Sequence, residues 1–426
     1  MTTPNNEASV NEHCLNSIVQ LSGTHSVTAA EDIYDSNGTK LWAKDAQITP
    51  ALQERLLQRK LRKPLEATLS VAGGIDADAI VMEAQQLYDT MPAVACLMGA
   101  QQAAVLETLS LVRLDPAAAL LLTTARANGN SFSHAVLVSV VALAVGIHAG
   151  RSGTDQMSLA QAGLLHDVGE LYINPEYLHS TRRLLPEEWK HVAVHPRVGE
   201  VVLEGLNYYS RSVTRAVAEH HERADGNGYP RQLTGDKISP IGQILSLAET
   251  LSGIIARKDN ALSRSCLALK LIPGEHAHDL VSVIATLQKH ARATSPIEGT
   301  VHDAVHYTEK IAHALDASLI ESARILAPGT ALPAPNQDLA LRLQYRLRTL
   351  QQALRATGIQ QGIDGPALEA LGEEDADIAL ELEMVGREIG WRMRDMAREL
   401  TLRIGDAPTA TAAHFAPLQA LLDGGA

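Results

Sequence analysis

The sequence predicts a mainly α-helical protein of several domains, with a small N-terminal region that contains a β-hairpin and a C-terminal helical extension. The 426 residues suffice for two or three domains. Ala and Leu, which lose little entropy in a helix, dominate a hydrophobic fraction of 46%. Apolar residues also recur at helical spacing through most of the chain beyond residue 50.

Residues 1–115 are predicted to form the N-terminal region, which contains the hairpin. Asp35-Ser36-Asn37-Gly38 is a turn signal between the apolar pairs at 33–34 and 41–42. Thr49 is the expected N-cap of the next helix, with Pro50 at its first position. The region carries no recognisable phosphoacceptor or cofactor motif, and a regulatory role is the expectation.

Residues 116–328 are predicted to form a helical catalytic domain, and a linker with Pro333 and Pro335 separates it from residues 336–426. This C-terminal extension contains two amphipathic helices. They either form a hairpin packed on their own chain or provide a coiled-coil-like contact for a homodimer or a protein partner. The apolar positions are Leu339, Leu343, Leu347, Leu350 and Leu354, then Ile378, Leu382, Val385, Ile389, Met396 and Leu400.

Charge and composition narrow the expected partners and location. The net charge of −13 disfavours a nucleic-acid polymer, although metal ions can supply a local positive field for a small anion. The sequence has no apolar run of roughly 18 residues and no secretion signal, so we expect a cytoplasmic protein without a membrane segment. Cys14, Cys96 and Cys266 are far apart and predict neither a disulfide framework nor a thiolate zinc site.

Histidines and acids recur at intervals of about 25–32 residues in the central region. This spacing lets each ligand come from a different helix and converge on one centre. Imidazole and carboxylate together suit iron, manganese or zinc, with iron or manganese favoured where oxygen ligands and open positions coexist. The residues are His134, His166, Asp167, His195, His220, His221 and Glu249.

Asp167 is the expected bridge between two ions, because one carboxylate can give an oxygen to each. Two ions roughly 3.5–4 Å apart would hold a hydroxide between them and stabilise both oxygens of a phosphodiester displacement. The loop at 225–230 follows His221, and its Gly226 and Gly228 allow close backbone approach while Tyr229 offers a face to a guanine base. The alternative is that this loop is merely a turn.

Together these motifs resemble the HD-GYP family. They are HDVGE at 166–170, HP at 195–196, HHE at 220–222 and GYP at 228–230. The resemblance implies an HD-type helical bundle over residues 116–328 that hydrolyses cyclic dinucleotides, above all cyclic di-GMP, to linear pGpG or GMP with two divalent ions. The residues named above would be the metal ligands, with His166 and Asp167 central to catalysis. The implied substrate contacts are Glu170, Gly226, Gly228, Tyr229 and Lys258.

The chain departs from the family's pattern at several positions. Glu170 replaces a lysine that meets a substrate phosphate, and Glu249 replaces an aspartate ligand. Ser252 replaces a second aspartate, and residues 258–261 replace an arginine-containing element. Asn130 stands where some members place a glutamate for a third metal, so two ions are expected.

These departures leave a second interpretation open, in which a degenerate module binds cyclic di-GMP or a protein partner without turnover. The two interpretations differ in whether other basic residues compensate for the lost positive charge. The candidates are Arg182, Arg183, Arg223 and Arg257.

Overall fold

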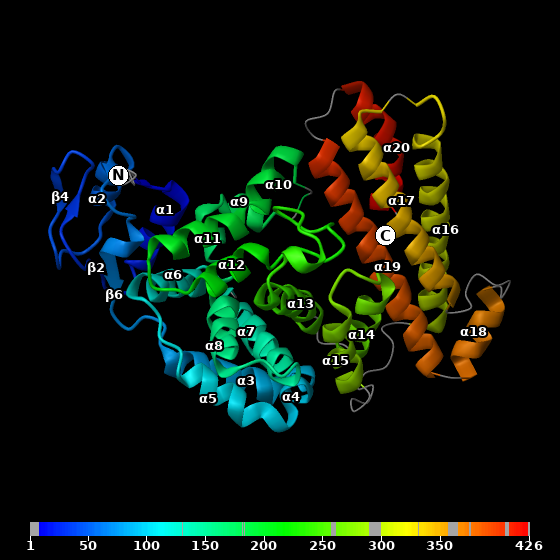
Figure 1. The fold of residues 1–426 in the computed structure, drawn as a ribbon, viewed down its shortest axis with the longest axis horizontal. Helices are drawn as coiled ribbons and strands as arrows, with labels where there is room; N and C mark the ends of the chain where they lie inside the picture. The colour runs from blue at the N-terminus through cyan, green and yellow to red at the C-terminus, as the bar shows by residue number, and fades with distance from the viewer. Residues whose placement is uncertain are drawn as a thin grey trace. The chain divides into compact units, whose positions relative to one another are not determined.

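The structure of the protein is a computed structural model that describes residues 8–129, 131–180, 182, 184–256, 261–288, 300–330, 332–356, 365–374, 376–404 and 409–424. Helices hold most of these residues and the strands are short, which confirms the predicted mainly α fold (Figure 1). Packing divides the chain into two compact units. The first contains the N-terminal region and the central bundle, and the second contains most of the C-terminal helices.

The first part of the N-terminal region, residues 8–71, holds two α-helices and three small antiparallel strand pairs. The predicted hairpin is confirmed, because β3 and β4 pair with Ile33 opposite Trp42. Asp35 fixes its turn by accepting from the backbone N–H groups of Asn37 and Thr39. The elements are β1 (Ala8–Ser9), α1 (Glu12–Leu21), β2 (Val27–Ala29), β3 (Ile33–Tyr34), β4 (Lys40–Trp42), α2 (Pro50–Leu57), β5 (Lys60–Leu61) and β6 (Leu69–Val71).

The central bundle packs around α7, whose side chains are buried on nearly every side. Gly163 brings α8 against it, because a Cβ at this glycine would lie 2.5 Å from Ser139 Cα. The helical elements of this unit are η1 (Glu66–Thr68), α3 (Ala77–Thr90), α4 (Pro92–Met98), η2 (Gly99–Gln101), α5 (Gln102–Ser110), α6 (Pro116–Ala127), α7 (Ser131–His148), α8 (Gly153–Leu165), η3 (Val168–Tyr172), α9 (Pro175–Leu178), α11 (His195–Gly205), α12 (Arg211–Glu219), η4 (Gly235–Lys237) and α13 (Pro240–Ile255). Two further helices, α10 (Pro186–Ala193) and α15 (His278–Gln288), are divided between the two units.

The N-terminal region is joined to the bundle at the short helix η3. Asn11 Nδ2 donates to the carbonyl oxygen of Tyr172 at 3.0 Å. The hydroxyl of Tyr172 donates to Glu66 Oε1 at 2.6 Å. The domain boundary predicted at residue 115 therefore falls inside one compact unit. The regulatory role of residues 1–115 stays a prediction.

The C-terminal unit has a closed apolar core of its own. Leu347, Leu350 and Leu354 of α17 are 0% exposed, and they share this core with Val385 and Ile389 of α19. This confirms that the amphipathic helices pack on their own chain, so their apolar stripes are not free for a homodimer contact. The helices are α14 (Ala261–Leu271), α16 (Val301–Ile325), α17 (Ala334–Ala356), α18 (Gly365–Glu374), α19 (Ala376–Ile404) and α20 (Thr409–Gly424).

Helix α16 belongs to this unit by packing, although the sequence placed it within 116–328. Its Ile311 and Leu315 are buried in the C-terminal core. The reason is that the proline-containing linker turns the chain between two helices of one core. It does not separate two domains.

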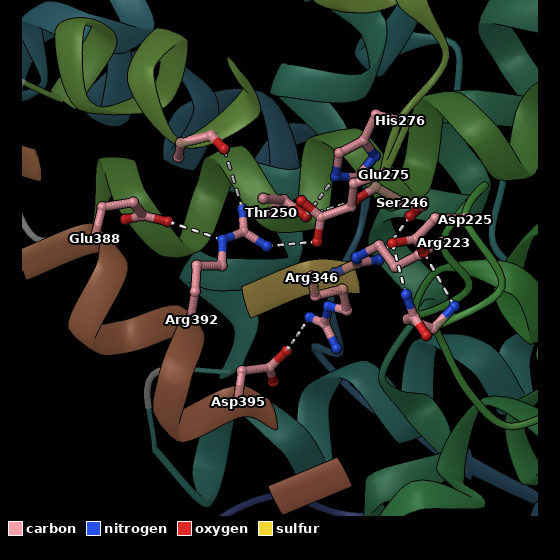
Figure 2. A network of polar contacts seen from close by, with 12 residues as sticks. Arg223, Asp225, Ser246, Thr250, Glu275, His276, Arg346, Glu388, Arg392 and Asp395 are labelled. Atoms are coloured by element: carbon pink, nitrogen blue, oxygen red, sulfur yellow. Dashed lines mark hydrogen bonds and ion pairs between the residues drawn. The ribbon is translucent and has the colours of Figure 1, made fainter. Parts of the chain in front are cut away.

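Buried arginines add a polar layer to the same unit (Figure 2). The Arg392 guanidinium contacts Glu275 and lies 3.2 Å from Glu388 Oε1. Arg346 Nη2 lies 3.6 Å from Asp395 Oδ2. A guanidinium removed from water needs such carboxylates, so these helices are held in register by charge as well as by apolar contact.

No single helix in the described ranges combines the length and apolar composition that crossing a bilayer requires, and α6 with α7 meets that test only as a pair bent by 118°.

We expect Leu347→Ala to lower the free energy of unfolding of the C-terminal unit by about 2–5 kcal/mol, because it leaves a cavity in a closed core. Leu341→Ala is the matched control, since Leu341 lies on the same helix and is 51% exposed. Denaturant unfolding followed by circular dichroism measures both changes. Equal stability of the two variants would contradict the assignment of these leucines to an intramolecular core.

Candidate metal centre

Asp167 lies at the middle of the cluster, directly after the C-cap of α8. Its Oδ2 faces Nε2 of His166 at 2.9 Å and Nε2 of His134 at 3.8 Å. Its Oδ1 faces Nε2 of His195 at 3.3 Å and Nε2 of His220 at 3.5 Å. This carboxylate therefore belongs to two groups of possible metal ligands, and within each group the ligand atoms lie within 4.8 Å of one another. The first group is His134, His166 and Asp167, and the second is Asp167, His195, His220 and His221.

Glu249 joins the first of these groups from helix α13. Its Oε2 lies 3.2 Å from His134 Nε2 and 3.5 Å from His166 Nε2. The extra methylene, relative to the aspartate of the family's pattern, does not keep the carboxylate out of the cluster. The structure thus brings together all the side chains that the sequence nominated as metal ligands.

Three of the histidines are oriented by their own backbone. In each, Nδ1 lies close to the carbonyl oxygen three residues earlier: His166 to Gly163 at 2.7 Å, His195 to Val192 at 2.8 Å and His220 to Val217 at 2.6 Å. A carbonyl oxygen can only accept, so Nδ1 carries the proton. Nε2 then faces Asp167 and, in the neutral imidazole, carries the lone pair that can bind a metal. This is the usual way in which a protein orients a metal-binding imidazole.

These histidines also lie at helix ends. His166 and His220 are the C-caps of α8 and α12, and Val192 lies in the last turn of α10. The last turn of a helix leaves carbonyl groups without helical partners and carries partial negative charge. Histidine therefore satisfies a free carbonyl at each end, and the three ends favour a cation nearby.

The ligand atoms of the cluster crowd together. His195 Nε2 and His220 Nε2 lie 3.1 Å apart, and in the neutral tautomer with Nδ1 protonated both present lone pairs. The buried atoms His166 Nε2 and Glu249 Oε2 make no hydrogen bond of normal geometry among the described residues, although Asp167 Oδ2 lies 2.9 Å from the first and His134 Nε2 lies 3.2 Å from the second. Buried acceptors that face one another in this way fit a metal ion.

The pKa values show how strongly the cluster is charged. Burial opposes the charged form of His166, yet the carboxylates of Asp167 and Glu249 outweigh it and raise the pKa of His166 to about 10. Burial likewise disfavours the Glu249 carboxylate, but His134 and His166 lower its pKa to about 2. Burial dominates at His220 and lowers its pKa to about 4. Without a metal ion, the two carboxylates are therefore ionised and pair with a protonated His166, whereas His220 stays neutral.

Glu170 lies at the edge of the cluster on η3. The side chain is half-buried, and burial followed by the negative charge of Asp167 raises its pKa to about 7. The imidazoles of His195, His166 and His134 act in the opposite direction. Where the family's pattern has a lysine, this chain therefore has a carboxyl group whose pKa is shifted by the charges of the candidate ligands.

Two glycines of the motifs lie where another backbone segment is too close to leave room for a side chain. A Cβ at Gly169 would lie 2.1 Å from the carbonyl oxygen of His195. A Cβ at Gly228 would lie 2.4 Å from Glu222 Cα and 2.5 Å from the carbonyl oxygen of His221. The loop at 225–230 is thus packed against the ligand helices, which is more than the turn considered as an alternative.

Tyr229 is used differently from the sequence expectation. Its ring stacks on His221, with centroids 4.6 Å apart and planes 27° apart. One face of the tyrosine therefore supports a candidate ligand.

Glu222, part of the HHE motif, has a supporting role that the sequence did not predict. It is fully buried, and its two carboxylate oxygens accept from the backbone N–H groups of Arg231 at 2.6 Å and Leu233 at 2.8 Å. These bonds fix the chain that follows the glycine loop. Because the partners are backbone groups, no residue type in the sequence announces them.

Arg223, one of the basic residues that could compensate for the lost positive charge, is held in place by neutral groups. Its guanidinium donates to Ser246 Oγ at 2.7 Å (Figure 2) and to the carbonyl oxygen of Glu222 at 3.0 Å. These contacts bind the arginine to α13 and to the loop. Burial, the neighbouring imidazoles and the positive charge of Arg223 all lower the pKa of His221, so this arginine acts on the cluster.

Several other residues that could belong to the site are buried without a role in the cluster, exposed, or outside the described residues. Ser252 is fully buried and its Oγ has no hydrogen-bond partner within the described part of the chain. His191, a possible partner of His195 by spacing, is exposed, as expected for a surface histidine. Arg182 is also exposed. Asn130, Arg183, Arg257 and residues 258–260, including Lys258, lie outside the described residues.

Comparisons with known proteins agree with the site. Residues 120–278 match the HD domain family model. A 3'3'-cGAMP-specific phosphodiesterase of Vibrio cholerae is 32% identical over 130 residues, covering 30% of this chain and 27% of the relative. A cyclic di-GMP phosphodiesterase of Borreliella burgdorferi is 30% identical over 125 residues, covering 29% and 33%. The chain thus spans about a third or less of the length of each of these relatives.

Among solved structures, an HDG"Y"P protein from Bdellovibrio bacteriovorus is 17% identical, with a TM-score of 0.33, and the match covers 62% of this chain and 95% of that one.

The bundle and its clustered histidines and carboxylates define an HD domain, the helical class in which metal ligands come from several helices. With the HHE and GYP motifs in place, this part of the chain belongs to the HD-GYP family.

We expect Gly169→Ala to lower the free energy of unfolding by about 1–3 kcal/mol, because the added methyl group collides with the His195 backbone. Gly253→Ala on α13 is the control, since a Cβ there meets nothing within 4 Å and alanine is favoured in a helix by about 1 kcal/mol. Thermal unfolding measures both. A Gly169→Ala protein as stable as the control would contradict the close approach of η3 and α11.

Proposed function

We propose that this protein is a metal-dependent phosphodiesterase that hydrolyses a cyclic dinucleotide. The observation that carries the proposal is Asp167, which presents one carboxylate oxygen to each of two groups of ligand atoms. Such an arrangement suits a pair of ions that share a carboxylate, the architecture used for in-line phosphoryl displacement.

The relatives support the substrate class. The two named above act on 3'3'-cGAMP and on cyclic di-GMP by their descriptions. Both substrates are cyclic dinucleotides with two phosphodiester links. We propose cyclic di-GMP as the substrate and linear pGpG or GMP as the product.

Iron or manganese is the proposed cofactor, in two copies. One set of ligands combines His134, His166 and Glu249 with Asp167, and the other combines His195, His220 and His221 with Asp167. Mixed imidazole and carboxylate sets favour these metals where positions remain open for water. Bound divalent ions would supply a water of lowered pKa and neutralise charge on the phosphate.

The chain's own residues orient the ligands and exclude water from one side of the centre. His166, His195 and His220 are at most 2% exposed, whereas His134 is 32% and Asp167 22% exposed. Substrate would therefore approach over His134 and Asp167, while the deeper imidazoles lie in a region of low dielectric, where electrostatic interactions are stronger. Gly226, Gly228 and Tyr229 are the proposed substrate contacts of the glycine loop.

Binding without turnover remains a second candidate, because one observation favours it. Glu170 replaces a phosphate-binding lysine with a half-buried carboxyl group beside Asp167. A hydrolysis assay on cyclic di-GMP with added iron or manganese separates the two candidates. Binding without product formation by the metal-loaded protein would support the second.

We expect Asp167→Asn to remove most of the bound metal and to reduce hydrolysis to background while the helical fold persists. Loss of a ligand shared by both ions should exceed the roughly 10–100-fold cost of removing a group that merely orients a ligand. His191→Ala is the control, since this exposed histidine lies near the site in sequence but outside both ligand groups. Metal analysis of anaerobically purified protein gives the answer. Full metal content in Asp167→Asn would refute the bridging role.

A further inference from the structure

We propose that Tyr172 and Asn11 are positioning residues of the metal centre, through which the N-terminal region fixes η3 and, with it, the Asp167 carboxylate. The inference rests on the proposed function, since it concerns how the same centre keeps its geometry. It gives residues 8–71 a part in metal binding, although the ligands named above all lie between residues 134 and 249.

Tyr172, the last residue of η3, is bound through its hydroxyl to the N-terminal region. The hydroxyl donates to Glu66 Oε1 at 2.6 Å, and Glu66 is buried on η1. Burial, followed by the effects of Cys14 and Glu66, raises the pKa of Tyr172 well above its usual value, so the hydroxyl keeps its proton and remains the donor. A hydrogen bond to a carboxylate is stronger than one between neutral groups. This bond therefore ties the end of η3 to η1.

Asn11 makes a second connection to the same residue. Its Oδ1 accepts from the backbone N–H groups of His13 and Cys14 and so caps α1. Its Nδ2 donates to the carbonyl oxygen of Tyr172 at 3.0 Å. An aspartate could cap the helix equally well, but its carboxylate has no N–H group to donate. The amide therefore joins the start of α1 to the end of η3.

Helix α11 fixes η3 nearer its start. A Cβ at Gly169 would lie 2.1 Å from the carbonyl oxygen of His195 and 2.8 Å from the backbone nitrogen of Gly199. Gly169 and Tyr172 are three residues apart, and such residues lie above one another in a 3₁₀ helix. One side of η3 is therefore held at two points, by α11 at Gly169 and by the N-terminal region at Tyr172. Rotation of η3 would disrupt one of these contacts.

The bridging carboxylate lies at the start of this segment. Asp167 is the N-cap of η3, and its carbonyl oxygen accepts from the N–H group of Glu170 at 2.9 Å, so its backbone moves with η3. Its Oδ2 lies 2.9 Å from His166 Nε2, and its Oδ1 lies 3.3 Å from His195 Nε2. A shift towards one group of ligands takes the carboxylate away from the other. Metal–ligand distances tolerate changes of only about 0.2 Å.

The short length of η3 makes its position depend on its neighbours. It has only 5 residues, too few to hold its place by its own helical hydrogen bonds. Helices α1, α6 and α11 pack against it. Because Asp167 belongs to both ligand groups, a displacement of η3 acts on both ions. The N-terminal region therefore acts on the centre at the ligand that the two ions share.

The test compares the wild-type chain with two variants that each remove one of these hydrogen bonds. Tyr172→Phe keeps the ring and loses the hydroxyl, and Asn11→Asp keeps the cap of α1 and loses the donor. Each full-length protein is stripped with a chelator and titrated calorimetrically with Mn²⁺. The visible absorption of the Co²⁺ form reports the ligand geometry directly. Asp167→Asn tests the centre itself, and circular dichroism melting verifies the fold of every variant.

Tyr209→Phe is the matched control, because it also removes one tyrosine hydrogen bond from the same compact unit. The Tyr209 hydroxyl accepts from the backbone N–H group of Asp115 at 3.2 Å and lies on the turn between α11 and α12. This variant reports what a loss of stability alone does to metal binding.

We expect Tyr172→Phe and Asn11→Asp each to weaken Mn²⁺ binding by about 10-fold, the lower end of the range for groups that orient a ligand, and to change the Co²⁺ spectrum. Tyr209→Phe should lower the unfolding temperature and leave both metal readouts at their wild-type values. A purely structural role of Tyr172 would give the same result as this control.

Wild-type affinity and spectrum in Tyr172→Phe and Asn11→Asp, with metal lost in Asp167→Asn, would overturn the inference and leave the proposed function intact. Equal losses of metal affinity in Tyr172→Phe and Tyr209→Phe would also refute it, because metal binding would then follow stability alone. Metal retained in Asp167→Asn would instead count against the proposed function itself. Should Tyr172→Phe not fold, Asn11→Asp decides the question, since its helix cap is intact.

Discussion

The architecture of the centre depends on a shortage of positive charge around Asp167. Its two oxygens face four imidazole nitrogens at 2.9–3.8 Å, and Glu249 adds a second carboxylate to one side. No lysine or arginine of the described residues pairs with either acid, so within the protein only imidazoles can balance their charge. Everything else in the bundle serves to hold these groups at that spacing: glycines that let backbones meet, helices that end at the centre, and Glu222, which fixes the loop beyond His221.

Much of this could be predicted because the information is local or periodic. Histidine and acid spacing nominated the ligand set, Asp35 to Gly38 predicted the hairpin, and the leucine periodicity of 339–354 predicted an amphipathic helix. The sequence could not say which surface that helix covers, because the apolar stripe of a packed hairpin and that of a dimer contact are identical in pattern. The burial of Leu347 and Leu350 within one chain decides between them.

Other features depend on contacts between distant backbones and had no sequence signal. Glu222 binds two N–H groups, Tyr229 stacks on the preceding His221, and α16 joins the C-terminal core despite the proline-rich segment after it. In each case the residue type is compatible with several roles, and tertiary packing selects one. Glu170 is the clearest example: where the family's pattern has a lysine, this chain has a half-buried carboxyl group whose pKa is raised by burial and by the charge of Asp167.

The hydrogen bonds from the imidazole Nδ1 atoms to helix-end carbonyls have a consequence for how the site exchanges its ions. These bonds hold His166, His195 and His220 in single rotamers whether or not an ion is bound. An entering ion then finds preformed ligands and pays little conformational entropy, unlike the metal of a zinc finger, which must order its chain on binding. Loading and stripping of metal should therefore leave the secondary structure of the bundle unchanged.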